Sequence, residues 1–324
     1  MAAKSPNTKN PVERKSAPYR SAPGSARSYA LGGAVVEAAK LPPGLHIVAT
    51  PIGNLGDITL RALEALAGAD LIACEDTRVT RKLLQRYAIA TPLTPYHDHN
   101  AAKARPFLLE RLAGGAAIAL VSDAGTPLVS DPGFKLVRAA HDSGYSVTVL
   151  PGPSAPLAAL AVAGLPTDQF FFAGFLPPKQ TARAARIAEL ARIPATLLLF
   201  ETAPRLAATL ADLAAGLGNR EAALCRELTK LHEEIRRGDL ATLAQSFSAA
   251  AGALRGEIVL VIAPPQAPSR TGADDADHLL RGALARLSLK DAVGEVAAAT
   301  GLPRRDVYQR ALALSQDRDH GAPR

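Results

Sequence analysis

The sequence lacks the features that mark disulfide-rich and zinc-binding proteins. It has two cysteines in 324 residues, Cys74 and Cys225, and each lies in an apolar run. Neither belongs to a C-x-x-C motif or a Cys/His cluster, and the seven histidines show no H-x-x-x-H spacing. We therefore expect buried thiols in a reducing compartment and no structural metal.

Long hydrophobic runs are also missing. No apolar segment reaches the length of a membrane span, and no continuous apolar stretch follows the basic residues at the N-terminus. Hydrophobic residues are 48% of the chain, which is enough for a folded core. The sequence thus predicts a soluble cytoplasmic protein with no membrane partner; an organellar transit peptide is the alternative for the N-terminus.

Two common nucleotide-binding motifs are absent as well. No G-x-G-x-x-G follows a strand, which disfavours a nicotinamide site or the usual Rossmann-type methyltransferase site. No G-x-x-x-x-G-K-[ST] is present, which disfavours a P-loop nucleotidase.

The positive charge is concentrated at one end of the chain. The net charge is +7, but residues 1–43 hold seven basic residues against two acidic ones. The remaining residues are nearly neutral, so any basic patch on the folded body is local. Because residues 1–43 are rich in Ser, Ala and Pro with little apolar periodicity, we predict a disordered basic tail there.

Strands and helices alternate after this tail. Apolar strands at 45–50, 69–74, 116–121 and 145–150 are separated by segments with helical spacing. Single helices between strands require a parallel sheet with right-handed crossovers. We therefore predict an N-terminal αβ domain over 44–152.

The pattern changes after Pro153. Shorter strands and a turn region at 230–238 predict a second αβ domain with a mixed sheet over 153–265. The segments predicted beyond it are a Pro-rich linker over 266–276, a helix-turn-helix-like helical segment over 277–316 and a disordered end over 317–324.

Loops rich in Gly, Pro and acidic residues follow four strands of the first domain. In open α/β sheets, ligands bind outside the carboxyl ends of the strands, where glycines let backbone N–H groups approach them. A tight connection without a ligand explains any single loop, but four at one edge indicate a binding site. The loops are 51–57, 75–78, 122–133 and 151–154.

Seven segments, which include these loops, match one known family. They are Thr50-Pro-Ile-Gly-Asn-Leu-Gly-Asp-Ile-Thr59, Glu75-Asp-Thr-Arg78, His97-Asp-His-Asn100, Ser122-Asp-Ala-Gly-Thr-Pro127, Asp131-Pro-Gly133, Pro151-Gly-Pro-Ser154 and Gly174-Phe-Leu-Pro177. In this order they resemble the ribosomal RNA small subunit methyltransferase I family of the tetrapyrrole methylase superfamily, over about residues 44–316. One departure is Phe200-Glu-Thr-Ala-Pro-Arg205, where family members often carry His or Pro before the Arg.

The resemblance implies S-adenosylmethionine as methyl donor and the ribose 2′-oxygen of a cytidine in the 16S rRNA decoding region as acceptor. It also implies two αβ domains with the cofactor in a cleft between them, a homodimer, and 16S rRNA or the small ribosomal subunit as partner. Such a donor, with adenine, ribose, sulfonium and amino-acid ends, suits several small loops. The candidate cofactor-binding residues are Pro51, Gly53, Ser122, Asp123, Ala124, Gly125, Thr126, Ser130, Pro153 and Ser154.

Methyl transfer to a hydroxyl needs a group that accepts the hydroxyl proton. The candidate catalytic residues are His97, Asp98, Glu75 and Asp76. The histidine loop is the sharper signal, because packing explains two imidazoles around a carboxylate poorly. Asn100 as a helix cap is the alternative there, and a buried ion-pair cluster with Arg78 is the alternative for Glu75 and Asp76. Asp57 and Asp123 are the next candidates for the proton acceptor, although we expect Asp57 to cap the following helix.

Exposed basic side chains are the candidates for RNA binding, although a solvated helix face is the usual role of such residues. They are Arg78, Arg81, Lys82, Lys103, Arg304 and Arg305.

Two other functions stay open. One is a small-molecule methylase of the same superfamily that acts on a tetrapyrrole, which explains the loops but leaves the basic helices without a role. The other is a non-catalytic rRNA-binding assembly factor that kept the fold.

Overall fold

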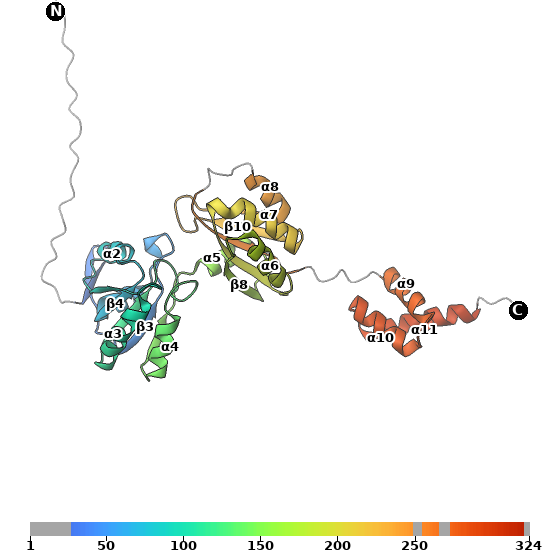
Figure 1. The fold of residues 1–324 in the computed structure, drawn as a ribbon, viewed down its shortest axis with the longest axis horizontal. Coiled ribbons are helices and arrows are strands. Elements are labelled where there is room, and N and C mark those ends of the chain that lie inside the picture. The colour runs from blue at the N-terminus through green and yellow to red at the C-terminus, as the bar shows by residue number, and fades with distance from the viewer. Residues whose placement is uncertain (1–26, 249–254, 266–272, 321–324) are drawn as a thin grey trace, which may run out of the picture. The chain divides into compact units, whose positions relative to one another are not determined.

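A computed structural model describes residues 27–248, 255–265 and 273–320. The contacts divide the chain into two units, which are Met1–Ala158 with Glu227–Glu233, and Ala159–Arg226 with Glu234–Arg324. Each unit carries a five-stranded sheet (Figure 1).

The first unit is built on a parallel sheet, as the alternation of strands and helices predicts. Its strands are β3 (Gly44–Val48), β4 (Leu71–Cys74), β5 (Leu93–Pro95), β6 (Ala117–Val121) and β7 (Val147–Leu150). The order is β5-β4-β6-β3-β7, and every neighbouring pair is parallel. The three central strands are buried along their whole length, as expected of a parallel sheet that helices cover on both faces.

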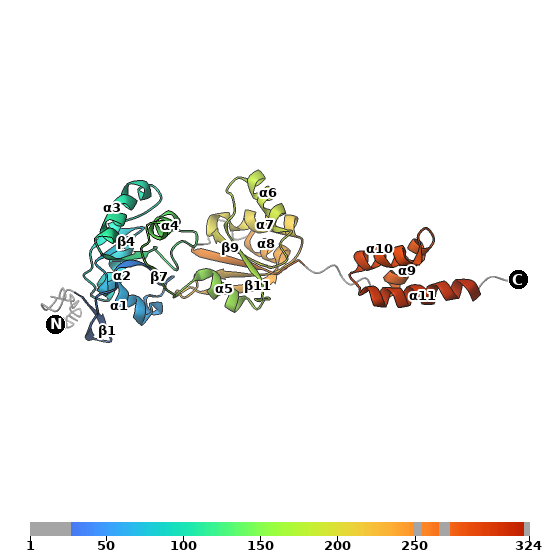
Figure 2. The same cartoon turned by 90° about the horizontal axis from the view of Figure 1, so that it is seen from below.

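Two hydrophobic cores occupy the two faces of this sheet. The helices are α1 (Leu60–Gly68), α2 (Thr77–Arg86), α3 (Ala101–Ala113) and α4 (Phe134–Asp142). Leu63 of α1 and Leu84 of α2 pack into one core, and Leu108 of α3 and Leu136 of α4 pack into the other. Figure 2 shows α1 and α3 on opposite sides of the strands.

The strand order reverses beside β3. The chain passes from β3 to β4 and β5 on one side, whereas β7 lies on the other side of β3 and β6 is inserted between β3 and β4. The carboxyl ends of strands at such a reversal are where open α/β sheets bind ligands. The loops that follow β3, β6 and β7 therefore share the ligand-binding edge.

A β-hairpin precedes the first domain and corrects the prediction of a disordered tail over 1–43. β1 (Ser28–Leu31) and β2 (Ala34–Glu37) pair antiparallel around Gly32 and Gly33, both with positive φ, as two-residue hairpin turns require. Tyr29 is buried in the core beside α1, and Arg27 forms an ion pair with Asp70 at 2.8 Å. Residues 1–26 lie outside the described ranges.

The second unit has the mixed sheet that the sequence predicts. Its strands are β8 (Phe170–Phe175), β9 (Thr196–Thr202), β10 (Glu221–Arg226), β11 (Glu234–Asp239) and β12 (Glu257–Ile262). The order is β11-β10-β12-β9-β8, in which only the β8–β9 pair is parallel. The expected turn region at 230–238 includes most of β11, in which Ile235 is the one large apolar residue among charged ones.

The second sheet is accompanied by helices and by one hydrophobic core. The helices are α5 (Ala155–Ala163), α6 (Gln180–Leu190), α7 (Leu206–Leu217) and α8 (Leu240–Ser248). Leu190, Leu210 and Leu240 pack with the sheet residues Leu199 and Leu260 in this core.

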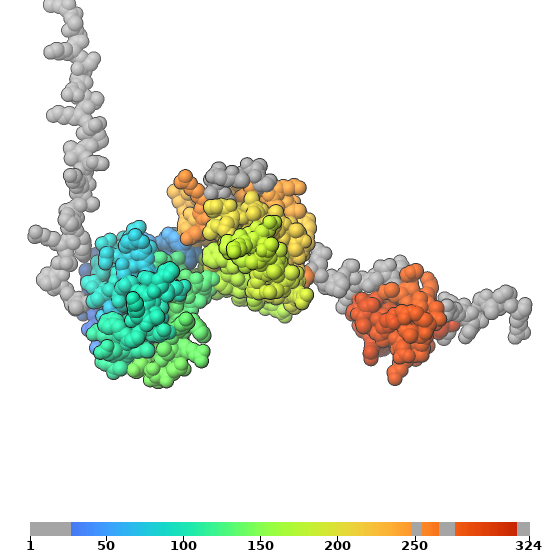
Figure 3. Space-filling model, in the orientation of Figure 1, coloured from blue at the N-terminus to red at the C-terminus, as the bar shows by residue number. Residues whose placement is uncertain are grey.

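The C-terminal residues form three helices with a core of their own. They are α9 (Ala273–Leu284), α10 (Leu289–Thr300) and α11 (Arg304–His320). Ser288 caps α10, and Gly301 ends it in the left-handed conformation, so the expected helix, turn and helix are present. α9 starts inside the predicted 266–276 linker, and α11 continues past residue 316 to His320. The space-filling view shows these helices as a compact body (Figure 3).

Candidate functional site

The loops after β3 and β6 are joined by backbone hydrogen bonds. Thr50 and Gly125 each donate an N–H to the carbonyl of the other at 2.9 Å. The Thr50 hydroxyl donates to the Ser122 carbonyl at 3.3 Å. Gly125 has a φ of +77°, which a side chain disfavours. Two of the loops predicted to bind the cofactor therefore form one surface.

The loop after β7 joins the same surface. The Thr126 hydroxyl donates to the Pro153 carbonyl at 3.3 Å. A Cβ at Gly125 would lie 3.4 Å from Cγ2 of Ile52 and 3.8 Å from the Pro153 carbonyl oxygen. Gly125 thus lies where all three loops meet, and it is buried there with its N–H and its carbonyl both bonded to Thr50.

The β6 loop continues through a segment of unusual backbone conformation. Leu128 and Ser130 have φ values of 74° and 66°, and Gly133 has 140°. Non-glycine residues in this region cost about 1–2 kcal/mol each and cluster at functional sites. Ser130, a predicted cofactor ligand, is exposed within this segment.

Asp76 is committed to the start of α2. Its Oδ1 accepts the Arg78 backbone N–H at 2.8 Å, and its Oδ2 forms an ion pair with Arg78 Nη2 at 2.6 Å. These hydrogen bonds lower the pKa of Asp76 to about 2. The Arg78 side chain is 84% exposed, so this pair is a surface cap and not the buried cluster considered above. Asp76 is therefore a poor proton acceptor.

Glu75, Asp123 and Asp131 have the opposite electrostatic character. Burial raises the pKa of all three, and Asp123 repels both Glu75 and Asp131. Asp123 Oδ1 also accepts the Asp76 backbone N–H at 2.9 Å, which connects the β4 and β6 loops. Raised carboxyl pKa values in a loop cluster are typical of proton-transfer sites. Asp131, which was not among the catalytic candidates, becomes part of the cluster through the fold.

The histidine loop is shaped by Asn100. The Asn100 Oδ1 accepts the His97 backbone N–H at 2.9 Å, and its Nδ2 donates to the Pro95 carbonyl at 3.0 Å. Although Asn100 precedes α3, its side chain makes no cap hydrogen bond to the helix. His97 Nδ1 is buried without a hydrogen-bond partner in the described part of the chain. Asp98 is exposed and raises the pKa of Glu75 and Asp131, so it faces the same cluster.

Asp57 does not cap the helix that follows it, contrary to expectation. Thr59 caps α1 by accepting the Ala62 N–H at 3.1 Å, and Asn54 caps the 3-10 turn Leu55–Asp57. Asp57 lies at the end of that turn, which is out of reach of the first N–H groups of α1. Its Oδ2 is buried and lacks a hydrogen-bond partner among the described residues.

No sequence motif marks residues 227–233 as neighbours of the site, yet they pack on the loop after β3 within the first unit. The Asn54 backbone N–H donates to the Thr229 hydroxyl at 3.2 Å. A Cβ on Gly53 would overlap Lys230 Cγ and lie 2.8 Å from its Cε, so the lysine stem occupies that space. Lys230 Nζ is held by Glu227 at 2.8 Å. Gly53 is therefore required for this contact.

The basic candidates are spread over separate helices. Arg81 and Lys82 are exposed on α2, and Lys103 is exposed on α3. Arg304 and Arg305 are exposed at the start of α11 in the C-terminal helices. Arg78 differs from these residues because it is paired with Asp76.

The described ranges hold neither a cluster of metal-ligand side chains nor a membrane-spanning helix. No group of three or more His, Cys, Asp or Glu side chains there could hold a metal ion. None of the helices there is long and apolar enough to cross a membrane.

Two family models match the chain. The model of the Tetrapyrrole (Corrin/Porphyrin) Methylases matches residues 44–244. The model of the RsmI C-terminal HTH domain matches residues 270–315. Together they cover the parallel sheet, four strands of the mixed sheet and most of the C-terminal helices.

Known proteins agree with these models. Ribosomal RNA small subunit methyltransferase I of Mesorhizobium japonicum is 50% identical over 292 residues, which cover 90% of this chain and 99% of that protein. The protein of the same name from Erythrobacter litoralis is 52% identical over 276 residues, with 85% and 96% covered. A diphthine synthase crystal structure shares the fold at 18% identity and a TM-score of 0.53, over 68% of this chain and 89% of that one. The chain therefore belongs to the ribosomal RNA small subunit methyltransferase I family of the tetrapyrrole methylases, and it is a methyltransferase of the S-adenosylmethionine-dependent kind.

Proposed function

We propose that the chain methylates the ribose 2′-oxygen of a cytidine in the decoding region of 16S rRNA. The observation that carries the proposal is the junction of the β3, β6 and β7 loops at Gly125, beside carboxylates whose pKa is raised. The names of the relatives support ribosomal RNA as the substrate class. The proposal implies a cytoplasmic protein, because ribosomal subunits are the substrate.

The loop junction fits S-adenosylmethionine. Beside buried Gly125, exposed Ala124 and partly exposed Pro153 offer apolar surface for an adenine. Pro51, Gly53 and the Ser122–Thr126 loop supply further backbone groups, and Ser154 lies next to Pro153. The acidic cluster complements a cationic ligand. When bound, the cofactor supplies an electrophilic methyl group on a sulfonium.

The acidic and histidine loops would form the acceptor side. A ribose hydroxyl is a weak acid, so its oxygen attacks well only if a nearby group takes the proton. Glu75 has a raised pKa, and His97 has a buried Nδ1 without a described partner, so both can accept a proton. Asp98 would support them electrostatically, and Asp76 would position Arg78 through its ion pair.

Basic side chains would hold the RNA backbone. Exposed Arg81, Lys82 and Lys103 can contact phosphates near the acceptor loops, and Arg78 can do so while bound to Asp76. Arg304 and Arg305 would add contacts from the C-terminal helices.

A homodimer completes the proposal. β8 is an edge strand, and its aromatic residues Phe170 and Phe175 are 46% and 52% exposed. Exposed apolar surface on an unpaired edge is typical of a protein–protein interface. Analytical ultracentrifugation of the protein and of Phe175→Glu tests this part: the variant should become monomeric, and a monomeric wild type would overturn it.

The function is tested by offering one labelled methyl donor to several substrates. Naked 16S rRNA, small ribosomal subunits and a tetrapyrrole are incubated separately with the full chain. Label should enter ribosomal RNA in at least one of its two forms. Label in the tetrapyrrole alone would identify a small-molecule methylase, and cofactor binding without any transfer would identify an assembly factor; either result overturns the proposal.

A further inference from the structure

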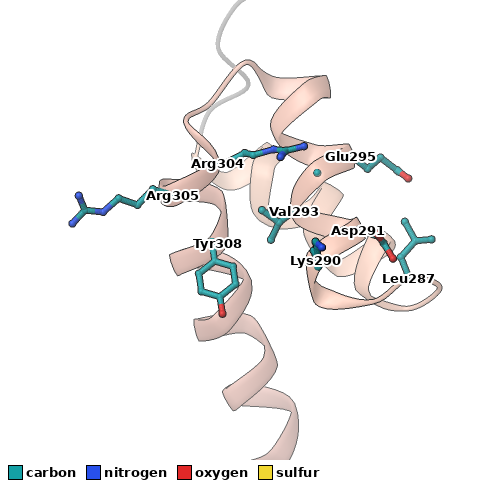
Figure 4. Close-up of a pocket in the computed structure, with 9 residues that line it drawn as sticks. Leu287, Lys290, Asp291, Val293, Glu295, Arg304, Arg305 and Tyr308 are labelled. Atoms are coloured by element: carbon teal, nitrogen blue, oxygen red, sulfur yellow. The ribbon is translucent and has the colours of Figure 1, made fainter.

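A groove lies between α10 and α11 in the C-terminal helices. Its volume is about 680 Å³, within the range of about 300–1,000 Å³ that small-ligand sites occupy. Its lining includes Lys290, Val293 and Gly294 from α10, and Arg304 and Tyr308 from α11 (Figure 4). None of these residues belongs to the loop junction described above.

Tyr308 gives the groove a flat, partly apolar surface. The residue is 43% exposed, whereas its neighbour Val307 is fully buried in the helical core. Val293, only 6% exposed, adds apolar lining from α10. An exposed aromatic ring beside apolar lining suits a planar ligand with a polar rim.

The charge of the groove favours an anion. Its two acidic side chains already have partners: Glu295 pairs with Arg286, and Asp291 accepts a hydrogen bond from the Ser288 hydroxyl at 2.6 Å. Its basic side chains are exposed and pair with no described carboxylate. They are Lys290, Arg304 and Arg305.

Gly294 keeps the groove open. It lies inside α10, where glycine weakens a helix, and a Cβ there would be 3.7 Å from Arg304 Nη2. In Figure 4 the Arg304 side chain extends towards α10, whereas Arg305 points away from it. A longer side chain at position 294 would therefore fill the space between α10 and the Arg304 guanidinium.

We propose that this groove binds one unpaired nucleotide of RNA, with its base on Tyr308 and its phosphates on Arg304 and Lys290. The inference rests on the proposed function, which supplies an RNA substrate. A base stacked on a side chain requires a nucleotide outside a duplex, because the neighbouring bases in a duplex stack on both faces of each base. The groove would thus recognise single-stranded RNA beside the methylated site.

The test measures binding of a fluorescent single-stranded oligoribonucleotide to full-length variants. Tyr308→Ala and Gly294→Leu should each weaken binding by about tenfold, as expected for the loss of one stacked base. Tyr308→Phe, which keeps the ring, should bind as the wild type does. Ala298→Leu is the matched control for Gly294→Leu, since Ala298 is exposed on α10 outside the groove. Leucine favours a helix more than glycine does, so lost binding in Gly294→Leu cannot come from a weakened α10.

The outcomes separate this inference from the proposed function. Equal affinity of all four variants, equal binding of the same sequence as a duplex, or displacement of the RNA by an acidic peptide at equal concentration would overturn the groove assignment. Methylation of ribosomal RNA is measured on the same proteins. If the wild type methylates RNA while Tyr308→Ala binds normally, only the groove fails; if no protein methylates RNA, the proposed function itself fails.

Discussion

Asp123 accepts a hydrogen bond from the backbone N–H of Asp76 at 2.9 Å. This contact joins the loop after β4 to the loop after β6, and it uses a carboxylate whose pKa is raised by burial. The side chain of Asp76 is meanwhile occupied by Arg78. Two acidic side chains in adjacent loops thus differ: Asp76 holds the start of α2, and Asp123 belongs to the candidate site.

Glu75→Gln should lower the rate of methyl transfer by about 10²–10⁴-fold while both ligands still bind. Burial, reinforced by Asp123 and Asp131, raises the pKa of Glu75 above its ordinary value of 4.5. Because the ionised form accepts the proton, the wild-type rate should fall as the pH drops through this raised pKa. Single-turnover methylation across pH measures both effects. An unchanged rate and profile would move the base to His97, which His97→Ala then tests.

Gly125→Val should abolish S-adenosylmethionine binding without unfolding the protein. A Cβ there already contacts Ile52, so the larger valine side chain should disturb the junction where three loops join. Gly144→Val is the matched control, because Gly144 has nearly the same φ of +76° with nothing within 4 Å of its Cβ position. Calorimetry should show binding to the control alone. Normal affinity in Gly125→Val would place the cofactor elsewhere.

Gly53→Ala should reduce thermal stability, and a second change, Lys230→Ala, should restore it. The new methyl group overlaps the Lys230 stem, which cannot retreat freely while Nζ is held by Glu227. The two changes should therefore be non-additive, as expected of residues in contact. A double-mutant cycle on the melting temperature measures this coupling. Additive effects of the two changes on the melting temperature would show that the Lys230 side chain does not restrict the residue at position 53.

Asp70→Asn should detach the N-terminal hairpin. Burial opposes ionisation of Asp70, but the N–H of Ala117 and the guanidinium of Arg27 together lower its pKa. A lowered carboxyl pKa stabilises the fold above the unfolded value and loses this effect as the pH falls through the folded value. Wild-type stability should therefore approach that of the variant below about pH 4. Urea titration at several pH values measures the free energy of unfolding of both proteins. A difference between them that stays constant with pH would show that ionised Asp70 does not stabilise the fold.

Deletion of residues 270–324 should weaken RNA binding and flatten its dependence on salt, while cofactor affinity is kept. Phosphate contacts release counterions when they form, so fewer basic residues give a smaller slope of affinity against salt. Filter binding at several salt concentrations measures the slope. Normal binding and methylation by the truncated chain would refute a role of these helices in RNA recognition.

The alternation of strands and helices was enough to predict the parallel sheet and the edge at which its loops meet. Single apolar strands separated by single helices permit few other arrangements. The predicted meeting of Ser122–Thr126 with Pro151–Ser154 required only that their strands lie near one another. The position of the acidic loop 75–78 at the same edge of the sheet follows from the same reasoning.

Other parts could not be predicted because they depend on long-range contacts. Thr229 and Lys230 contact the β3 loop from 175 residues further along the chain, a pairing that no local pattern reveals. Leu128 and Ser130 take positive φ values although neither is glycine, so composition gives no signal. Asp57 failed as a cap because it ends a 3-10 turn, and Thr59, which directly precedes α1, accepts the capping N–H instead.

The proposed acceptor is a ribose 2′-oxygen. The position of the methyl group on the product nucleoside shows whether this assignment is correct. Methylated 16S rRNA is digested completely to nucleosides, which are separated and identified by mass spectrometry. We expect cytidine with the added mass on its ribose, and the same RNA should resist alkaline cleavage at that nucleotide. A methyl group on a base nitrogen or carbon would contradict it.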